Sequence, residues 1–223
     1  MKNQINTDNL KSMLKLQDKL NSVINPDWAQ QNYPFLRAAF VESAEALEHH
    51  GWKWWKNQTA DIYQLQIELV DILHFYLSDA LVQNEGSIAT AVKTIEKEIQ
   101  ETSILFDSKT YTLFDMDILS LLELIGAMSA CRRRSFAILN ELMQKCSLSW
   151  SEAYSRYVFK NVLNLFRQDN GYRSGEYIKI WAGEEDNVWL ERISKTINID
   201  SEDFPDQLRS GLEKKYIAIK NGQ

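Results

Sequence analysis

The spacing of apolar residues along most of the chain is that of amphipathic helices. Leu10, Met13, Leu14 and Leu20 recur at intervals that place them on one helix face before Pro26 stops the pattern, which predicts a helix over about 8–24. The same reasoning predicts further helices over about 34–47, 60–83, 87–105, 114–145, 150–168 and 203–219. Residues 170–187 show no such period, and we expect an ordered loop there. The pattern therefore predicts an all-α fold.

Several residues predict where these helices begin, end or pack closely. Thr59 is expected to cap the third helix, and Gly51 is the residue that most easily takes a left-handed conformation at the end of the second. Ser149 and Glu152 have the spacing of a capping box. Gly126 lies inside the longest predicted helix, where it marks either a break or a point of close packing.

Length and composition suit one folded unit. With 223 residues, of which 44% are hydrophobic, the chain can bury a sizeable core. Only three prolines and eight glycines interrupt it, which also favours long helices. We expect a single domain over 1–223, and the alternative is that a smaller mobile lobe lies within about 87–150.

Charge and cysteine usage narrow the functional classes. A net charge of −6 and a pI near 5.2 argue against a partner that is nucleic acid or an anionic membrane. The run Arg132–Arg134 is interpreted as a solvated helix face or an ion-pair site. Two distant cysteines and a polar start predict a reducing cytoplasm, and the apolar stretch around 118–128 is too short to span a bilayer.

Two pairs of carboxylates carry the candidate chemistry. Glu42 and Glu45 stand three residues apart on the second predicted helix, and Glu68 and Asp71 repeat this spacing on the third. Residues at i and i+3 share one helix face, so four acids converge if the two helices pack side by side. Either pair alone is more often structural, but two pairs favour a site. Such a cluster repels itself unless cations neutralise it, and oxygen ligands suit Mg²⁺ or Mn²⁺.

The sequence around these acids resembles a known family. Glu42-x-x-Glu45, a loop, and Glu68-x-x-Asp71 look like the signature of the all-α NTP pyrophosphohydrolases. VESAEALEHHGWKWWK followed by ELVDILHF resembles the dimeric dUTPases in particular, as do LKLQDKLN and KNVLNLFRQDNGYRSGEYIKIWAGEEDN. The resemblance extends over roughly residues 10–190. It implies a helical bundle with a four-helix core and additional C-terminal helices, and a homodimer.

The resemblance also implies an activity. A member of this family hydrolyses dUTP, and also dUDP, to dUMP, which keeps uracil out of DNA and supplies dUMP. Glu42, Glu45, Glu68 and Asp71 are then the ligands of Mg²⁺. Water activated at this site attacks phosphorus after losing its proton to a glutamate, for which Glu45 is favoured over Glu42.

The resemblance assigns the substrate contacts to two groups of residues. The phosphates are contacted from a helix and the loop after it, with two lysines of the tryptophan loop as further candidates: Lys160, Asn164, Arg167, Tyr172, Lys179, Lys53 and Lys56. The base and sugar are contacted by carboxamides, aromatics and a histidine: Gln17, Asn21, Trp52, His74 and Phe75. A core role for His74 is an equal alternative, and core packing is expected for Trp54 and Trp55.

Three alternatives remain open. A related enzyme could prefer dCTP or another nucleotide, although such enzymes are usually shorter. Asp71-x-x-His74 resembles half of a di-iron motif, but that fold needs two such motifs and only one occurs. The third alternative is a non-catalytic helical module that binds a partner through exposed aromatics.

Overall fold

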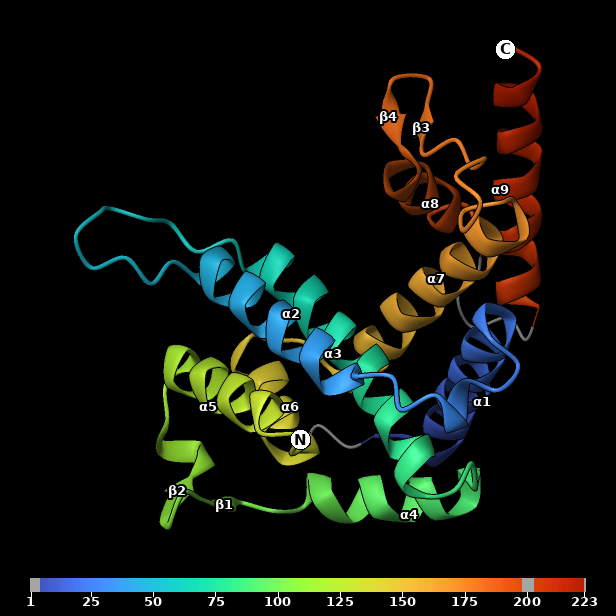
Figure 1. Cartoon of the computed structure of the whole chain (residues 1–223). Helices are drawn as coiled ribbons and strands as arrows, with labels where there is room; N and C mark the ends of the chain where they lie inside the picture. The colour runs from blue at the N-terminus through green and yellow to red at the C-terminus, as the bar shows by residue number, and fades with distance from the viewer. Residues whose placement is uncertain (1–4, 198–202, 223) are drawn as a thin grey trace.

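The computed structural model describes residues 5–197 and 203–222, and it confirms the all-α prediction (Figure 1). The helices of the first two thirds are α1 (Thr7–Ile24), α2 (Phe35–His50), α3 (Ile62–Gln83), α4 (Ile88–Ile99), α5 (Ile118–Ala130) and α6 (Phe136–Lys145). They are followed by α7 (Trp150–Asp169), α8 (Asp186–Ser194) and α9 (Phe204–Lys220). Short 3-10 turns lie at Trp28–Gln30 and Leu113–Asp115.

Polar side chains fix the starts of several helices, among them α1, α3, α6 and α7. Asn6 accepts hydrogen bonds from the first backbone N–H groups of α1, and Ser149 and Glu152 form the predicted capping box at α7. The prediction of Thr59 as the cap of α3 is wrong, because Asp61 accepts the hydrogen bond from Gln64 N. An Asp next to the first turn is an equally good cap and also suits the helix dipole. Gly51 ends α2 with a φ of 84°, as its conformational freedom predicts.

The central element is α3, which is buried on most of its circumference. Its fully buried side chains include Leu65, Leu69, Ile72, Leu73 and Tyr76. Helices α1, α2, α6 and α7 pack around it, and α2 also packs against α5 (Figure 1). A polar side chain on α3 therefore faces another helix rather than bulk water. This burial decides the environment of Glu68 and Asp71.

The segment after α4 departs from the prediction. The helix expected to reach Leu105 ends at Ile99, and Ser103–Phe106 (β1) pairs with Lys109–Thr112 (β2) as an antiparallel hairpin. Asp107 and Ser108 both have positive φ, of 48° and 62°, as a tight hairpin turn between right-twisted strands requires. The β-branched residues of KTYT favour the strand, and a helical period over such a short segment does not outweigh them.

The prediction of one long helix over 114–145 is also wrong. It is divided into α5 and α6 by residues 131–135, where Arg132 takes a φ of 61°. Ser135 caps α6 by accepting from Ile138 N. Arg134 forms ion pairs with Asp79 of α3 and with Glu98 of α4, the second at 2.9 Å. The arginine run is thus an ion-pair site at a helix break, and these contacts hold the break in place.

The C-terminal part follows the prediction more closely. Residues 170–185 are irregular except for a short antiparallel pair, Ile180–Trp181 (β3) with Glu184–Glu185 (β4), and α8 begins at Asp186. The fully buried Trp181 ring packs near Phe166 of α7 and Tyr216 of α9, which keeps this segment ordered. Helix α8 was not predicted, and α9 matches its expected range within a residue. Within the described residues no helix has both the length and the apolarity to cross a membrane.

Gly126 is a point of close packing between α5 and α2 and not a break. A Cβ atom at this position would lie 2.7 Å from Oγ of Ser43, which is itself held by a hydrogen bond to Phe40 O. We therefore expect Gly126→Ala to lower the free energy of unfolding by about 1–3 kcal/mol, because the interface cannot absorb the added atom without moving. Urea denaturation measures this change.

The matched control adds Ser43→Ala to Gly126→Ala, since this removes the obstructing oxygen. The double variant should recover most of the loss. Unchanged stability in Gly126→Ala, or a double variant no more stable than the single one, would contradict the packing argument.

Candidate active site

The carboxylates of α2 and α3 converge where the two helices pack side by side. One oxygen from each of Glu42, Glu68 and Asp71 lies within 4.8 Å of the others. Glu68 is buried, and Glu42 and Asp71 are half-buried. Glu45 lies one turn further along α2 and is exposed, so it stands at the edge of this group rather than within it. The four predicted acids therefore form a core of three with a fourth beside it.

Burial and mutual repulsion oppose the ionisation of these acids. Burial raises the pKa of Glu42 to about 7, and the charges of Asp71, Glu45 and Glu68 add to the rise. The pKa of Glu68 also rises to about 7, through burial and the charge of Asp71, against the lowering effect of Lys160. The pKa of Asp71 is raised by burial, which Lys160 opposes. Ionising all three acids near neutral pH thus requires a compensating positive charge.

This donor set fits a hard divalent cation. The three converging groups offer carboxylate oxygens, which Mg²⁺ prefers, and their pKa values are raised first by burial and then by repulsion, both of which a bound cation would offset. His49, which the sequence analysis did not single out, lies beside them, with Nε2 3.3 Å from Oε1 of Glu68. His49 lies near Glu68 because α2 and α3 pack antiparallel, which places the end of α2 beside the first turns of α3.

Cations approach the carboxylates from α7. The Nζ atom of Lys160 donates to Oδ2 of Asp71. Arg167 lies two turns further along the helix and binds Asp186 with two hydrogen bonds, of 2.7 and 2.8 Å. It also donates to Asn164 at 3.3 Å. Asp186 is fully buried, so it holds the guanidinium in one orientation. The sequence analysis assigned no role to this residue.

Two further predicted phosphate contacts, Tyr172 and Lys179, lie in the segment after α7. The guanidinium of Arg167 is 5.8 Å from the centre of the Tyr172 ring, and this ring is half exposed. Lys179 is exposed and forms an ion pair of 3.2 Å with Glu185. Both side chains therefore stand near Arg167 or its partner segment, but neither contacts the carboxylate cluster.

A buried polar network joins α1, α3 and α7. Gln17 Nε2 donates to Asn21 Oδ1 at 3.1 Å, and Asn21 Nδ2 donates to Ser78 Oγ at 3.0 Å. Oε1 of Gln17 accepts from the Tyr157 hydroxyl at 2.8 Å and lies 2.9 Å from Nδ1 of His74. The structure thus brings together the predicted Gln17, Asn21 and His74, and it adds Tyr157 and Ser78, which no sequence motif singles out.

His74 is the most unusual member of this network. Its ring stacks on Tyr157 with 4.1 Å between centroids, and burial lowers its pKa to about 3, with a smaller effect from the charge of Lys160. The imidazole is therefore neutral at physiological pH. Its Nε2 atom is buried without a partner among the described residues. Phe75, the next residue, is half-buried and packs against the core.

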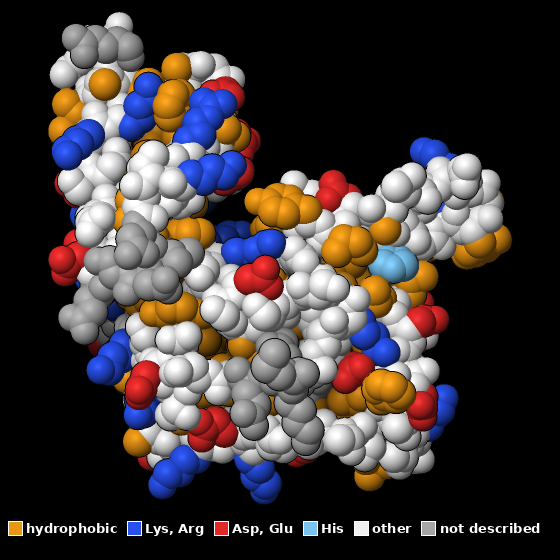
Figure 2. Space-filling model, turned by 180° about the vertical axis from the view of Figure 1, so that it is seen from behind, with side chains coloured by type: hydrophobic (Ala, Val, Ile, Leu, Met, Phe, Trp, Pro, Cys, Tyr) orange, Lys and Arg blue, Asp and Glu red, His pale blue; other side chains and the backbone are white. Residues whose placement is uncertain are grey.

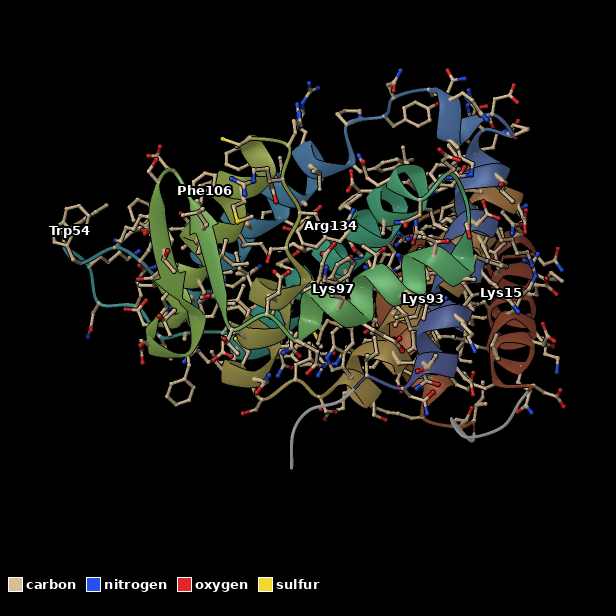
Figure 3. All side chains as sticks on the ribbon, turned by 90° about the horizontal axis from the view of Figure 1, so that it is seen from below. Lys15, Trp54, Lys93, Lys97, Phe106 and Arg134 are labelled. Carbon is tan, nitrogen blue, oxygen red and sulfur yellow. The ribbon has the colours of Figure 1, made fainter. Side chains whose placement is uncertain are left out.

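The tryptophan loop between α2 and α3 projects away from the carboxylates. Figure 3 shows Trp54 at its outer end, and the expectation that Trp54 and Trp55 pack in the core is wrong, because they are 87% and 59% exposed. Trp52 and Lys53 both bind Glu48, at 2.7 and 2.6 Å. Lys56 is exposed. Apolar residues on an 11-residue loop have no helix against which to pack, so aromatic content alone did not predict their burial.

A cleft of about 640 Å³ adjoins Lys160 and lies between α3, α7 and α8. From behind, the surface is hollowed between the C-terminal elements and the rest of the molecule, with lysine and arginine side chains in and beside the hollow (Figure 2). The cleft is lined from α3 by Tyr63, Gln64, Ile67 and Val70 and from α7 by Arg156, Phe159 and Lys160. Its volume and mixed lining suit a small polar ligand with an apolar part.

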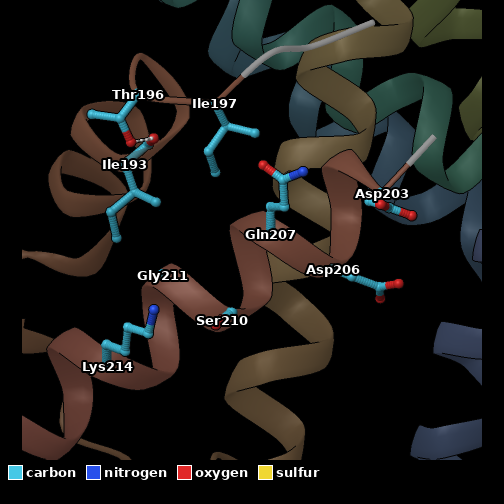
Figure 4. A pocket seen from close by; sticks show the side chains of 9 residues that line it. All are labelled: Ile193, Thr196, Ile197, Asp203, Asp206, Gln207, Ser210, Gly211 and Lys214. Carbon is cyan, nitrogen blue, oxygen red and sulfur yellow. Dashed lines mark hydrogen bonds between the residues drawn. The ribbon is translucent and has the colours of Figure 1, made fainter. Parts of the chain in front are cut away.

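A second hollow of about 550 Å³ lies between α8 and α9. Figure 4 shows the side chains that line it, among them Ile193, Gln207, Ser210 and Lys214. None of its lining residues is a predicted site residue, and none belongs to the carboxylate cluster. Of these two hollows, the cleft beside Lys160 is therefore the one lined by a predicted site residue.

Comparison with known proteins identifies a family. A family model described as dUTPase matches residues 9–172, which is well over half of the chain. The match spans α1 to α7 and so includes both carboxylate pairs, the polar network and Lys160. A comparison with curated protein sequences gives no match.

The raised pKa values predict how pH affects the metal-free protein. The folded-state pKa values of Glu42 and Glu68, about 7, exceed the ordinary value of 4.5, so folding takes up protons between these limits. Stability from these groups is present below pH 4.5 and is lost as the pH rises through 7. Glu42→Gln, which stays neutral, should therefore gain stability relative to the unsubstituted protein between pH 5 and 8.

We expect a relative gain of about 1 kcal/mol, because the partial exposure of Glu42 screens its repulsion. Urea denaturation in a chelating buffer at pH 5 and at pH 8 provides the measurement. The exposed Glu101→Gln serves as the control and should show no comparable pH dependence. A constant difference between Glu42→Gln and the unsubstituted protein across this range would show that Glu42 is not under repulsion.

Proposed function

The chain belongs to the dUTPase family, and we propose that it hydrolyses dUTP to dUMP and pyrophosphate, and dUDP to dUMP and phosphate, in a reaction that needs Mg²⁺. One observation carries the proposal. Three carboxylates from α2 and α3 converge within 4.8 Å, and Lys160, which binds Asp71, also lines a cleft large enough for a nucleotide. An acidic centre can receive a polyphosphate only when cations intervene, and this arrangement suits such a centre.

The burial of each acid suggests either a metal ligand or a general base. Glu42, Glu68 and Asp71 would hold the metal, which when bound supplies Lewis-acid stabilisation of phosphate charge and lowers the pKa of water. Glu45 is exposed at the edge of the group and keeps access to solvent. It is therefore the residue best placed to accept a proton from an attacking water. Glu42, whose carboxyl is proton-binding near neutral pH, is the alternative base.

Lys160 and Arg167 of α7 each bind a carboxylate. Lys160 binds Asp71, and a phosphate oxygen can take the place of that carboxylate once Asp71 is engaged elsewhere. Arg167 keeps its orientation through the buried Asp186 and so presents its remaining N–H groups toward Asn164 and the loop beyond. Asn164, Tyr172 and Lys179 complete this phosphate-facing side in the proposal.

The polar network between α1, α3 and α7 supports recognition of uracil. Each amide nitrogen of Gln17 and Asn21 carries two N–H groups, and the hydrogen bonds within the described residues use one of each. The remaining N–H groups can donate to the carbonyl oxygens of uracil. Tyr157 fixes which end of the Gln17 amide is the oxygen, and Ser78 does the same for Asn21. An amide held in one orientation would discriminate between a carbonyl and an amine of the base. His74 and Phe75, next along α3, would contact the sugar, and Trp52, on the loop that projects away, would contact the base only within the dimer proposed below.

We propose further that the protein is a homodimer of the cytoplasm. Exposed apolar side chains on α2 and the tryptophan loop, Phe40, Val41, Trp54 and Trp55, support an interface there. The two cysteines are free, which is compatible with a reducing compartment. Lys53 and Lys56 on the same loop are assigned to phosphate contact only within such an assembly.

Product analysis tests the function directly. Purified protein is incubated with dUTP, dCTP, dTTP and UTP, each with and without Mg²⁺, and the products are separated by ion-exchange chromatography. We expect dUMP from dUTP in the presence of Mg²⁺ and little product from the other nucleotides. Preferential hydrolysis of dCTP would favour the related pyrophosphohydrolases, and the absence of hydrolysis of any nucleotide would favour a non-catalytic module.

Removal of one carboxylate charge should abolish most turnover without unfolding the protein. Asp71→Asn keeps the shape of the side chain but weakens a ligand of a hard cation, so we expect kcat to fall by about a hundredfold or more, with an unchanged helical circular dichroism spectrum. Asp79→Asn, on the same helix but paired with Arg134, is the control for loss of a buried charge. Turnover of Asp71→Asn within a few-fold of the unsubstituted protein would contradict the assignment.

Substitutions in the amide network should alter the choice of base. If Gln17 and Asn21 bind uracil, replacement of either by Ala should lower kcat/KM for dUTP about tenfold or more, since a buried hydrogen bond of this kind contributes about 1–3 kcal/mol. Any residual dCTP activity should fall much less. Equal losses for both nucleotides would show that these residues support packing and not recognition.

A further inference from the structure

Arg156 is a cation of the cleft that neither the sequence analysis nor the proposed function uses. It lies on α7 one turn before Lys160, and both side chains line the cleft. Its guanidinium is 5.0 Å from the centre of the Tyr63 ring at the start of α3. Its NH1 atom is buried and has no hydrogen-bond partner among the described residues. A buried donor of a permanent charge is costly to leave unpaired, so this nitrogen points to an anionic ligand.

The acids that surround Arg156 are engaged elsewhere. Glu152, one turn earlier on α7, accepts hydrogen bonds from the backbone and hydroxyl of Ser149 in the capping box. Glu185 and Glu191, which line the same cleft, form ion pairs with Lys179 and Lys195. The hydrogen bonds from Ser149 and, less strongly, the charge of Arg156 lower the pKa of Glu152, so this carboxylate balances part of the guanidinium charge. No hydrogen bond among the described residues reaches NH1, which leaves this nitrogen for an anionic ligand.

The order of groups along α3 indicates which part of a nucleotide reaches Arg156. His74 belongs to the network proposed for the base, Asp71 and Glu68 to the proposed metal site, and Tyr63 stacks with Arg156. These positions follow one another over 11 residues, which is about 16 Å of helix. A nucleotide with its base at the network and its reacting phosphate at the carboxylates therefore extends its polyphosphate toward Tyr63.

From this geometry we infer that Arg156 binds the terminal phosphate of a nucleoside triphosphate and makes the site favour triphosphates over diphosphates. The inference rests on the proposed function. A guanidinium matches the two oxygens of a terminal phosphate with parallel hydrogen bonds, whereas a lysine offers a point charge. Stacking on Tyr63 limits the motion of the side chain before the ligand arrives. A diphosphate ends before Arg156 and does not gain from it.

The experiment compares dUTP and dUDP as substrates of the full chain with Mg²⁺. In Arg156→Gln, the ratio of kcat/KM for dUTP to that for dUDP should fall about tenfold or more, because charge-assisted hydrogen bonds are lost for dUTP alone. Arg156→Lys should give a smaller fall. Arg192→Gln is the matched control, because Arg192 is exposed, paired with Glu184 and not part of the cleft lining, and it should leave the ratio unchanged.

A second readout uses the product. Pyrophosphate should compete with dUTP less well in Arg156→Gln, by the same factor, while inhibition by dUMP stays as in the unsubstituted protein. Equal losses for dUTP and dUDP in Arg156→Gln, or an unchanged ratio, would overturn the inference and leave the proposed function intact. Absence of dUTP hydrolysis by the unsubstituted protein would overturn both.

Discussion

Repulsion between buried carboxylates is the constraint on which the rest of the site depends. Glu68 and Asp71 lie on a helix that is apolar around most of its circumference, and Glu42 faces them from the adjacent helix. The packing of α2 on α3 therefore places like charges where water cannot solvate them fully, and their pKa values rise. A protein gains nothing in stability from such a cluster. The metal binding proposed above would relieve this repulsion.

The positive side chains on α7 form the complement of this cluster. Lys160 binds Asp71, Arg167 binds the buried Asp186, and Arg156 has a buried nitrogen without a partner among the described residues. All three project from one long helix whose start is fixed by a capping box and whose end packs against α9. A rigid helix sets the spacing of these cations.

In the proposed function, the polar network separates base recognition from metal binding within one bundle. Gln17 and Asn21 come from α1 and bond to each other, and the bonds to Ser78 of α3 and Tyr157 of α7 cross helix interfaces. The hydroxyl groups of Tyr157 and Ser78 fix the amide orientations, while burial keeps His74 neutral. A change in the packing of α1 on α7 would therefore alter base selectivity before it altered the carboxylates.

The sequence by itself determined the helices, the i, i+3 spacing of the acidic pairs and the identity of most polar groups in the site, because these are local properties of a chain with helical periodicity. Its errors lay at residues 99–112 and 131–135, where local helix propensity competes with a tight turn at Asp107 and with the ion pairs of Arg134. Only the tertiary structure decided that Glu45 stands beside the cluster and that Trp54 is exposed. It also decided that Tyr157, Asp186 and Arg156 face the site, since these relations join residues far apart in the chain and depend on which helix faces meet.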